Sequence, residues 1–259
     1  VLTYLTRDKL MALSDGLIYG ALSIVFGYLI AWLMVKVLKV RRGRRGVFIN
    51  TIVNANTIFI GLPLNIALFG EASMPYFLVY YVLNTVSTWA FGAFLIANAS
   101  TEPQPAHRQK LNWTKPLPAP PLGFLVALVF LLADIPVPSF IHSTLDYVGS
   151  IVTPLSLLYI GITLADAGLK SIRFDKDTIA ALLGKFVLAP LIMVALIAAG
   201  HSILPLPSLE AKTLIVQSSV SALAVLPILA NEAKGDVRFA TNVVTTSTIL
   251  FMIVVPLVD

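Results

Sequence analysis

Long apolar runs alternate with short polar connections along almost the whole chain. A transmembrane helix needs about 20 largely apolar residues, and eight segments approach or exceed that length. They cover residues 13–38, 47–69, 75–98, 118–133, 143–165, 178–199, 209–231 and 237–258. The pattern therefore predicts an all-α, polytopic membrane protein with eight spans in this chain.

The second predicted span contains residues that do not suit the middle of a transmembrane helix. The run NANTIFIGLP, from Asn54 to Pro63, places two amides, a glycine and a proline there. Proline cannot continue a helix but suits the first position of a new one. Eight residues from Pro63 to Gly70 make about 12 Å of helix, so the predicted break lies near the middle of a bilayer core of about 30 Å. Irregular backbone at that depth survives only where protein buries it or where it lines a wet cavity.

The seventh predicted span carries a matching interruption. Its run QSSVSALAVLP ends on Leu226-Pro227, and an alignment on the Leu-Pro pairs places Asn54 opposite Ser218 and Thr57 opposite Ser221. The two interrupted spans are predicted to run in opposite directions through the membrane. Paired, antiparallel broken helices are the sequence signature of an inverted repeat with a central binding site.

The repeat predicts how the chain is divided. We expect an N-terminal repeat over residues 1–99, a cytoplasmic linker loop over 100–117 and a C-terminal repeat over 118–259. Five predicted spans follow the linker but only three precede it, and the sequence begins at Val1 without a methionine. We therefore expect two further helices before Val1, which would give ten spans as two inverted repeats of five.

Composition and charge agree with a membrane protein. Hydrophobic residues make up 58% of the chain and charged residues 12%, against about 45–50% and about 25% in soluble domains. Fourteen of the eighteen Lys and Arg lie on one side of the predicted topology, three lie on the other, and Lys185 lies within a span. The excess of positive charge marks the cytoplasmic side, so the loops near 41–46, 100–116, 166–177 and 232–236 are predicted to be cytoplasmic. The protein is expected in the cytoplasmic (inner) membrane.

The basic run from Arg41 to Arg45 and the cysteine count bear on which partners and sites are expected. The basic run RRGRR, from Arg41 to Arg45, can bind nucleic acid or anionic lipid, but beside a span it is read as a topology anchor. The chain has no cysteine, which excludes disulfides and thiolate metal sites. We therefore expect no nucleic-acid partner, metal or cofactor.

Several motifs resemble the auxin efflux carrier family of permeases, in particular its bacterial branch. They are NANTIFIGLPLNIALFG with YYVLNT in the first half, and PLSLLYIGITLAD with LPILANEAKGD in the second. The resemblance implies ten helices in two inverted repeats, with the fourth and ninth helices broken and crossing at the substrate site. It also implies carriage of small organic carboxylates such as malate by an elevator-like movement. Carried onto this chain, the crossing residues are Asn54, Asn56, Gly61, Pro63, Ser218, Ser219, Ser221 and Pro227.

The polar residues of these spans have local alternatives to substrate binding. The amides of Asn54 and Asn56 can hold a carboxylate or cap a half-helix, and Gly61 allows close backbone approach. The hydroxyls beside Gln217 can bond their own backbone. Asn84 can serve the site or link helices. The full candidate substrate-binding set is Asn54, Asn56, Thr57, Gly61, Pro63, Asn84, Lys185, Gln217, Ser218, Ser219, Ser221 and Pro227.

Lys185 is the only lysine well inside a predicted span. An intramembrane cation is by default a functional hypothesis. It can pair with an anion or stabilise an unwound carbonyl, and its position within about two turns of the inner surface also allows snorkelling.

The favoured function is a secondary transporter for small organic anions, with the lipid bilayer as its surroundings and a homodimer as one alternative for its assembly. A sodium-coupled symporter of the bile-acid type is an alternative, although no acidic residue stands between Asn50 and Gly70 or between Gln217 and Pro227. A membrane sensor that binds an organic anion without moving it is another. An enzyme is not expected, because no span carries a metal-type His/Glu spacing, a paired aspartate or a Ser-His arrangement. The sequence contains no ATP-binding loop, so transport would be driven by gradients.

Overall fold

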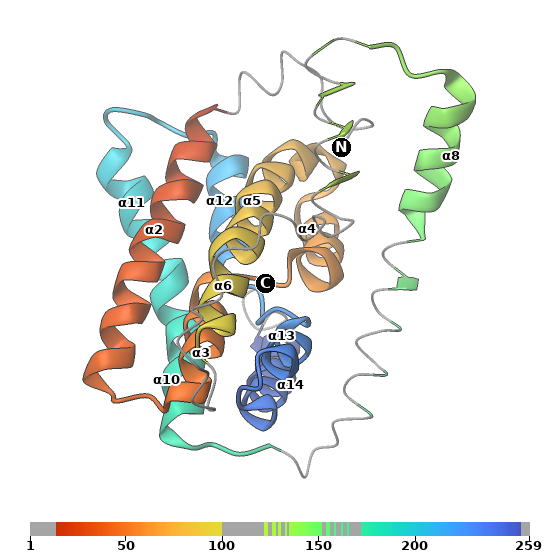
Figure 1. Cartoon of the computed structure of the whole chain (residues 1–259). Helices are drawn as coiled ribbons and strands as arrows, with labels where there is room; N and C mark the ends of the chain where they lie inside the picture. Colours follow the sequence, from red (N-terminus) through yellow and green to blue (C-terminus); the bar gives the residue numbers. More distant parts are fainter. Residues whose placement is uncertain are drawn as a thin grey trace.

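The computed structural model describes residues 14–99, 135–151 and 172–254, together with scattered residues between 122 and 133 and between 154 and 165. Every element of regular structure in these residues is helical (Figure 1). The prediction of an all-α protein is confirmed.

The first half contains one long helix, one interrupted helix and a third helix that changes its pitch. The α-helices are α2 (Ser14–Val37), α3 (Arg45–Val53), α4 (Leu62–Phe69), α5 (Met74–Val86) and α6 (Ala93–Ala97). Two π-helical segments, η2 (Thr57–Gly61) and η4 (Ser87–Gly92), precede α4 and α6. Two short 3₁₀ turns, η1 (Arg42–Arg44) and η3 (Glu71–Ser73), precede α3 and α5.

The second half again contains a long helix, an interrupted helix and another long helix, but here the first of the three changes its pitch. It contains α10 (Lys176–Leu183), the π-helical η6 (Gly184–Leu188), α11 (Ala189–Gly200), α12 (Ser208–Ser219), α13 (Leu226–Glu232) and α14 (Val237–Val254). Between the halves, α8 (Ser139–Ser150) has no buried residue and stands apart from the other helices (Figure 1).

Four helical stretches in the described residues have the length and apolar composition to cross a bilayer. They are Gly16–Val37, Arg42–Phe69, Glu71–Ala97 and Lys176–Gly200, and they match the first, second, third and sixth predicted spans. The seventh corresponds to α12 and α13, and the eighth to α14. Most of the fourth predicted span, much of the fifth and the linker over 100–117 lie outside the described residues.

Corresponding helices of the two halves run antiparallel where they meet. The N-terminal part of α2, around Ile18 and Leu22, lies beside the C-terminal part of α11, around Leu196 and Ala199. The long helices α2 and α11, which precede the broken helices of the two halves, therefore run antiparallel. This arrangement is the one expected of an inverted repeat.

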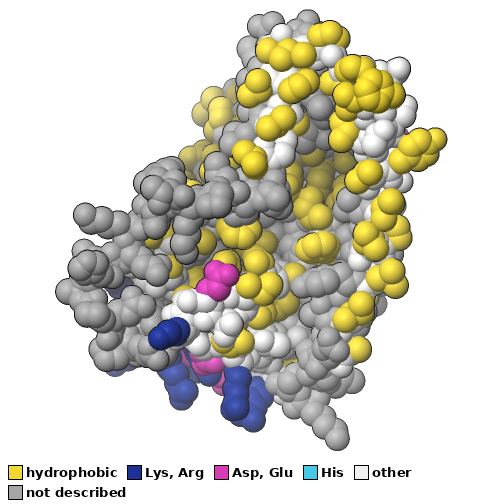
Figure 2. Space-filling model, turned by 45° about the vertical axis from the view of Figure 1, so that its right-hand side comes forward, with side chains coloured by type: hydrophobic (Ala, Val, Ile, Leu, Met, Phe, Trp, Pro, Cys, Tyr) yellow, Lys and Arg dark blue, Asp and Glu magenta, His cyan; other side chains and the backbone are white. Residues whose placement is uncertain are grey.

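Polar side chains lie inside the bundle and large apolar side chains lie on its outside. On α2, Leu29 and Trp32 are 57% and 51% exposed, whereas Asn50, Asn54 and Gln217 have no exposed surface. Figure 2 shows the same distribution on one face, with hydrophobic side chains spread over it and Lys and Arg gathered at one end. An apolar exterior is what lipid requires, and buried polar groups in such a bundle mark packing contacts or functional sites.

An ion cluster joins three segments at the end of the bundle where α3, α10 and α14 begin. Arg44 Nη1 lies 2.5 Å from Asp175 Oδ2 and 3.2 Å from Asp177 Oδ2, and its Nε lies 2.6 Å from Asp236 Oδ2. The Asp236 N–H donates to Gly43 O. The cluster therefore fixes the start of α3 against the second half of the chain.

Candidate functional site

The first broken helix is interrupted at Asn54 and held open by an amide from α5. The helix α3 ends at Val53, and Asn54 has extended backbone angles of φ −99° and ψ 148°. The N–H of Ala55 donates to Asn84 Oδ1 at 2.8 Å, and Asn84 Nδ2 donates to Ala55 O at 2.9 Å. One side chain thus replaces both hydrogen bonds that the helix would have supplied to Ala55, which explains how the break survives in an apolar environment.

The side chain of Asn54 is enclosed in a network of polar groups from three helices. Its Nδ2 donates to Asn50 Oδ1 at 2.8 Å and to the Tyr28 hydroxyl at 3.2 Å. Its Oδ1 accepts from Ser87 Oγ at 2.6 Å. Because protein groups occupy its donors and its acceptor and the side chain is fully buried, Asn54 shapes the break in this conformation rather than facing an open site.

The second broken helix is interrupted over a longer stretch with fewer supports. The helix α12 ends at Ser219, and α13 begins at Leu226 with Pro227 in its first turn. The N–H of Ala222 donates to Ser247 Oγ at 3.1 Å. Among the described residues, no acceptor lies within hydrogen-bonding distance of the N–H groups of Leu223, Ala224 and Val225.

The two breaks are in direct contact. The N–H of Asn56 donates to Ser221 O at 2.9 Å, and Gln217 Nε2 donates to Gly61 O at 3.0 Å. In addition, α12 packs against α4 and α13 packs against α3, so each first half-helix lies beside the second half of the other. Two interrupted helices therefore cross at their breaks inside the bundle.

The register between the two breaks differs from the sequence alignment. Asn54 and Val220 are the first residues after their half-helices, whereas the Leu-Pro alignment places Asn54 opposite Ser218. Counted from the ends of α3 and α12, that pairing is offset by two residues, whereas α4 and α13 both begin at the aligned leucines. The reason is that η2 adds a π-helical turn between the break and α4, and the second repeat has no such turn before α13.

Two of the buried polar atoms that lack a partner among the described residues lie at the crossing. They are Gln217 Oε1 and Ser221 Oγ, and in the described part of the chain Thr245 Oγ1 on α14 has no partner either. Asn56 accepts from the Phe59 N–H through Oδ1, but no described residue accepts from its Nδ2. Buried polar atoms almost always find partners, so these atoms indicate a place where a polar ligand or water binds.

Lys185 contacts the first break from η6. Its Nζ donates to Asn54 O at 3.1 Å, and its side chain has no exposed surface. The snorkelling alternative is therefore wrong, and the predicted contact with an unwound carbonyl is present. Lys185 lies in η6, and its partner Asn54 also bonds Ser87 in η4 and immediately precedes the break before η2. All three π-helical segments of the described residues thus meet around Asn54, and such segments are frequent at functional sites.

The remaining predicted residues have local roles. The hydroxyls of Ser218 and Ser219 donate to Ile215 O and Val216 O of their own helix. Thr57 is buried, and its hydroxyl accepts from Asn84 Nδ2 at 3.5 Å. Pro63, like Pro227, occupies the first turn of its second half-helix, as predicted.

Gly61 has a steric reason to lack a side chain. A Cβ at this position would lie 2.3 Å from Gln217 Oε1, well inside van der Waals contact. Glycine therefore allows the Gln217 amide to reach the backbone of the first break.

The structure adds residues that the sequence interpretation did not select. Tyr28, Asn50 and Ser87 complete the network around Asn54, and Ser247 supports the second break. For Ser247, the sequence does carry a signal. It lies in TNVVTTST, a run of small polar residues in the last span that is unusual for a helix facing lipid. Tyr28 and Ser87 carry no such signal, because single tyrosines and serines are ordinary in transmembrane helices.

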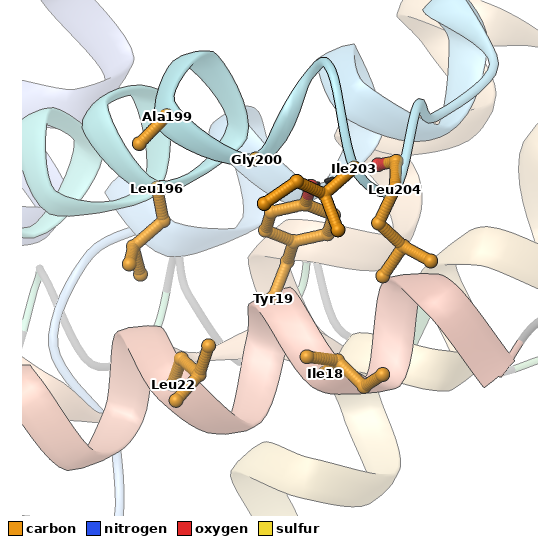
Figure 3. A pocket seen from close by; sticks show the side chains of 8 residues that line it. All are labelled: Ile18, Tyr19, Leu22, Leu196, Ala199, Gly200, Ile203 and Leu204. Carbon is orange, nitrogen blue, oxygen red and sulfur yellow. Dashed lines mark hydrogen bonds between the residues drawn. The ribbon is translucent and has the colours of Figure 1, made fainter.

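A separate groove lies on the outer surface between α2 and α11. It has a volume of about 320 Å³ and is lined by Ile18, Tyr19, Leu22, Leu196, Ala199, Gly200, Ile203 and Leu204 (Figure 3). The only polar side chain among these, Tyr19, donates its hydroxyl to Leu204 O at 2.8 Å. The groove therefore offers no group to orient a carboxylate, and the crossing is the better candidate for a polar ligand.

The sequence of the chain matches a known protein family. A family described as membrane transport protein matches residues 5–258, almost the entire chain. No curated protein matches the chain.

Proposed function

Because the chain belongs to the auxin efflux carrier family of membrane transport proteins, we propose that it is a secondary transporter for small organic carboxylate anions such as malate. The substrate binds where the two broken helices cross. We further propose that the protein lies in the cytoplasmic membrane with its arginine-rich end inside, and that no covalent chemistry accompanies transport.

The contact between the two breaks is the observation that carries this proposal. It joins Asn56 to Ser221 and Gln217 to Gly61 in the interior of the bundle. Buried polar atoms of Gln217 and Ser221 have no partner there among the residues that the structure describes. A transporter needs such groups because they must exchange partners each time the substrate binds and leaves.

The chemistry of the crossing suits a carboxylate. The Asn56 amide supplies N–H donors, and the backbone N–H groups of residues 223–225 precede the second half-helix. Backbone and amide donors stabilise an anion by hydrogen bonding. The amine of Lys185 donates to Asn54 O beside the crossing, and in its protonated form it favours an anion over a cation.

Movement of the crossing as a unit is the proposed transport step. The half-helices are linked by direct hydrogen bonds, so they are expected to shift together with their substrate. An elevator-like displacement against a separate scaffold would expose the crossing alternately to the two sides. Solute gradients would drive it.

The test is uptake of radiolabelled malate by proteoliposomes that contain the purified full-length protein. Asn56→Asp preserves the Oδ1 acceptor used by Phe59 but places a negative charge where an amide donor stands. Ser221→Ala removes a hydroxyl without a partner. We expect the first change to reduce malate uptake at least tenfold and the second to weaken half-saturation several-fold.

Ser219→Ala is the matched control, because the Ser219 hydroxyl donates only to its own helix. Its uptake should equal that of the unchanged protein. Folded protein that moves neither malate nor competing mono- and dicarboxylates would overturn the proposal. Uptake that requires sodium would favour the symporter alternative, and saturable binding without uptake would favour a sensor.

A further inference from the structure

Lys185 is a buried basic side chain at the crossing. The binding mode proposed above does not explain how its amine is balanced. Lys185 is among the largest side chains with no exposed surface. It lies in η6, which contacts α3 and α12 as well as its neighbours α10 and α11. The segment that carries Lys185 therefore packs against both the first broken helix and the second.

The hydrogen bonding of Lys185 is incomplete for a charged group. An ammonium has three N–H donors, and Nζ has one acceptor among the described residues, Asn54 O at 3.1 Å. An isolated buried ammonium is costly unless it is paired or neutralised. A neutral amine has only two N–H groups and no charge to solvate, so it suits this environment better when the crossing is empty.

In the part of the chain that the structure describes, no carboxylate pairs with Lys185. The ionisable side chains on the elements packed against η6 are Arg45 on α3, Lys176 and Asp177 on α10, and Glu210 and Lys212 on α12. Asp177 lies eight residues before Lys185, about 12 Å along the helix, and pairs with Arg44. Glu210 lies seven residues before Gln217, about 10 Å along α12. The helix α11 carries no ionisable side chain.

An anion bound at the crossing would shift the protonation equilibrium of the Lys185 amine. The crossing lies beside Asn54, whose carbonyl is the acceptor of the amine. A carboxylate bound there supplies the missing negative charge, and opposite charges favour the protonated form of an amine. Binding of the anion and binding of a proton are then thermodynamically linked, so each increases the affinity for the other.

We propose that Lys185 takes up one proton when the carboxylate binds at the crossing, so that the transporter carries the anion and a proton together. This inference rests on the proposed function, since it needs an anion at the crossing. The proton passes from water on the entry side to Nζ, where one N–H bond forms. On the exit side that bond breaks, the proton returns to water and the carboxylate leaves with it.

The experiment measures proton movement beside malate movement in the same proteoliposomes. A pH-sensitive dye is enclosed, the membrane voltage is clamped with potassium and valinomycin, and malate is added outside at neutral pH. We expect the lumen to acidify with about one proton per malate that enters. Protein-free liposomes correct for passive entry of the protonated acid.

Two substitutions test the assignment to Lys185. Lys185→Arg keeps a positive charge that does not titrate, so malate uptake should persist without acidification. Lys185→Met removes the charge, so malate affinity should fall at least tenfold and acidification should be lost. Glu210→Gln is the matched control, with both malate uptake and acidification retained.

Binding in detergent gives a readout that a purely structural role would not move. In the unchanged protein, malate affinity should fall with rising pH, by up to about tenfold per pH unit where Lys185 loses its proton. In Lys185→Arg the affinity should be flat over the same range. If Lys185→Arg does not fold, the number of protons that enter with each malate in the unchanged protein still tests proton coupling.

The outcomes separate this inference from the proposed function. Malate uptake without acidification by the unchanged protein overturns proton coupling and leaves the transporter intact. Loss of acidification in Glu210→Gln, with acidification retained in Lys185→Arg, assigns the proton to another residue and also overturns the proposal. If no malate enters the liposomes, the proposed function itself is overturned, and the inference falls with it.

Discussion

The two breaks at the crossing occupy equivalent places in the repeats but are supported very differently. At the first break, Asn84 bonds both the N–H and the carbonyl of Ala55, and Lys185 bonds the carbonyl of Asn54. At the second break, over the six residues 220–225, the Ala222 N–H donates to Ser247 Oγ, and Ser221 O accepts from the Asn56 N–H. The first break is therefore a fixed structural element, and the second keeps backbone donors available for a ligand.

The difference indicates that the two breaks have different roles at the site. A rigid break can hold a binding geometry without paying conformational entropy each time the ligand arrives. A break with few internal bonds can change its own hydrogen bonds as the substrate enters. We therefore expect substitutions at the first break to act mainly on stability, and substitutions at the second to act mainly on affinity.

The largest expected effect is at the support of the first break. Asn84→Leu leaves the Ala55 N–H without an acceptor and removes one of two donors to its carbonyl, since the Thr57 N–H remains. We expect a loss of about 2–4 kcal/mol in stability. Thermal unfolding of the purified protein in detergent measures it, and an unchanged midpoint would show that the first break does not depend on Asn84.

The matching substitution at the second break should cost less. Ser247→Ala removes one acceptor from one buried N–H, for which we expect about 1–2 kcal/mol. The same unfolding assay compares the two variants directly. If Ser247→Ala proves as damaging as Asn84→Leu, the contrast between a rigid and an adaptable break does not hold.

The contact between the breaks can be tested at Gly61. Gly61→Ala places a methyl 2.3 Å from Gln217 Oε1, so the flexible amide must turn away and lose its bond to Gly61 O. We expect about 1 kcal/mol of destabilisation and reduced malate uptake. The effect should be smaller in a Gln217→Ala background, where the clash is absent, and equal effects in both backgrounds would remove Gln217 as the cause.

The smallest effect is expected far from both breaks, in the ion cluster. Burial raises the pKa of Asp175, but hydrogen bonds from Thr178 and Arg44 outweigh it, and the net pKa lies below its ordinary value of 3.8. The carboxylate therefore contributes stability above pH 3.8, and this contribution disappears as the pH falls through the lowered pKa of the folded protein.

Asp175→Asn keeps a side chain that can cap α10 but removes the charge. Since the Asp175 side chain is 43% exposed, we expect less than about 1 kcal/mol of destabilisation at pH 7. The difference from the unchanged protein should vanish in strong acid, as unfolding midpoints at several pH values will show. Malate uptake should not change, and a loss of uptake would contradict the restriction of the site to the crossing.

The sequence by itself determined the helical class and the position of both breaks. Apolar runs of membrane length leave no other solution for the backbone than helices, because every peptide group must be bonded internally. Pro63 and Pro227 marked the starts of the second half-helices, since proline can begin a helix but not continue one. Asn54, Gly61 and Gln217 were selected because amides and glycine are rare at that depth without a reason.

Only the tertiary structure decided which polar groups meet. Asn54 and Ser87, or Lys185 and Asn54, are brought together by packing between helices, and nothing in the spacing of a single chain encodes that contact. The two-residue shift between the breaks has the same origin, because a π-helical turn changes the register without an obvious sequence signal. Periodicity specifies which residues are helical, whereas the partners of buried polar side chains depend on how the helices cross.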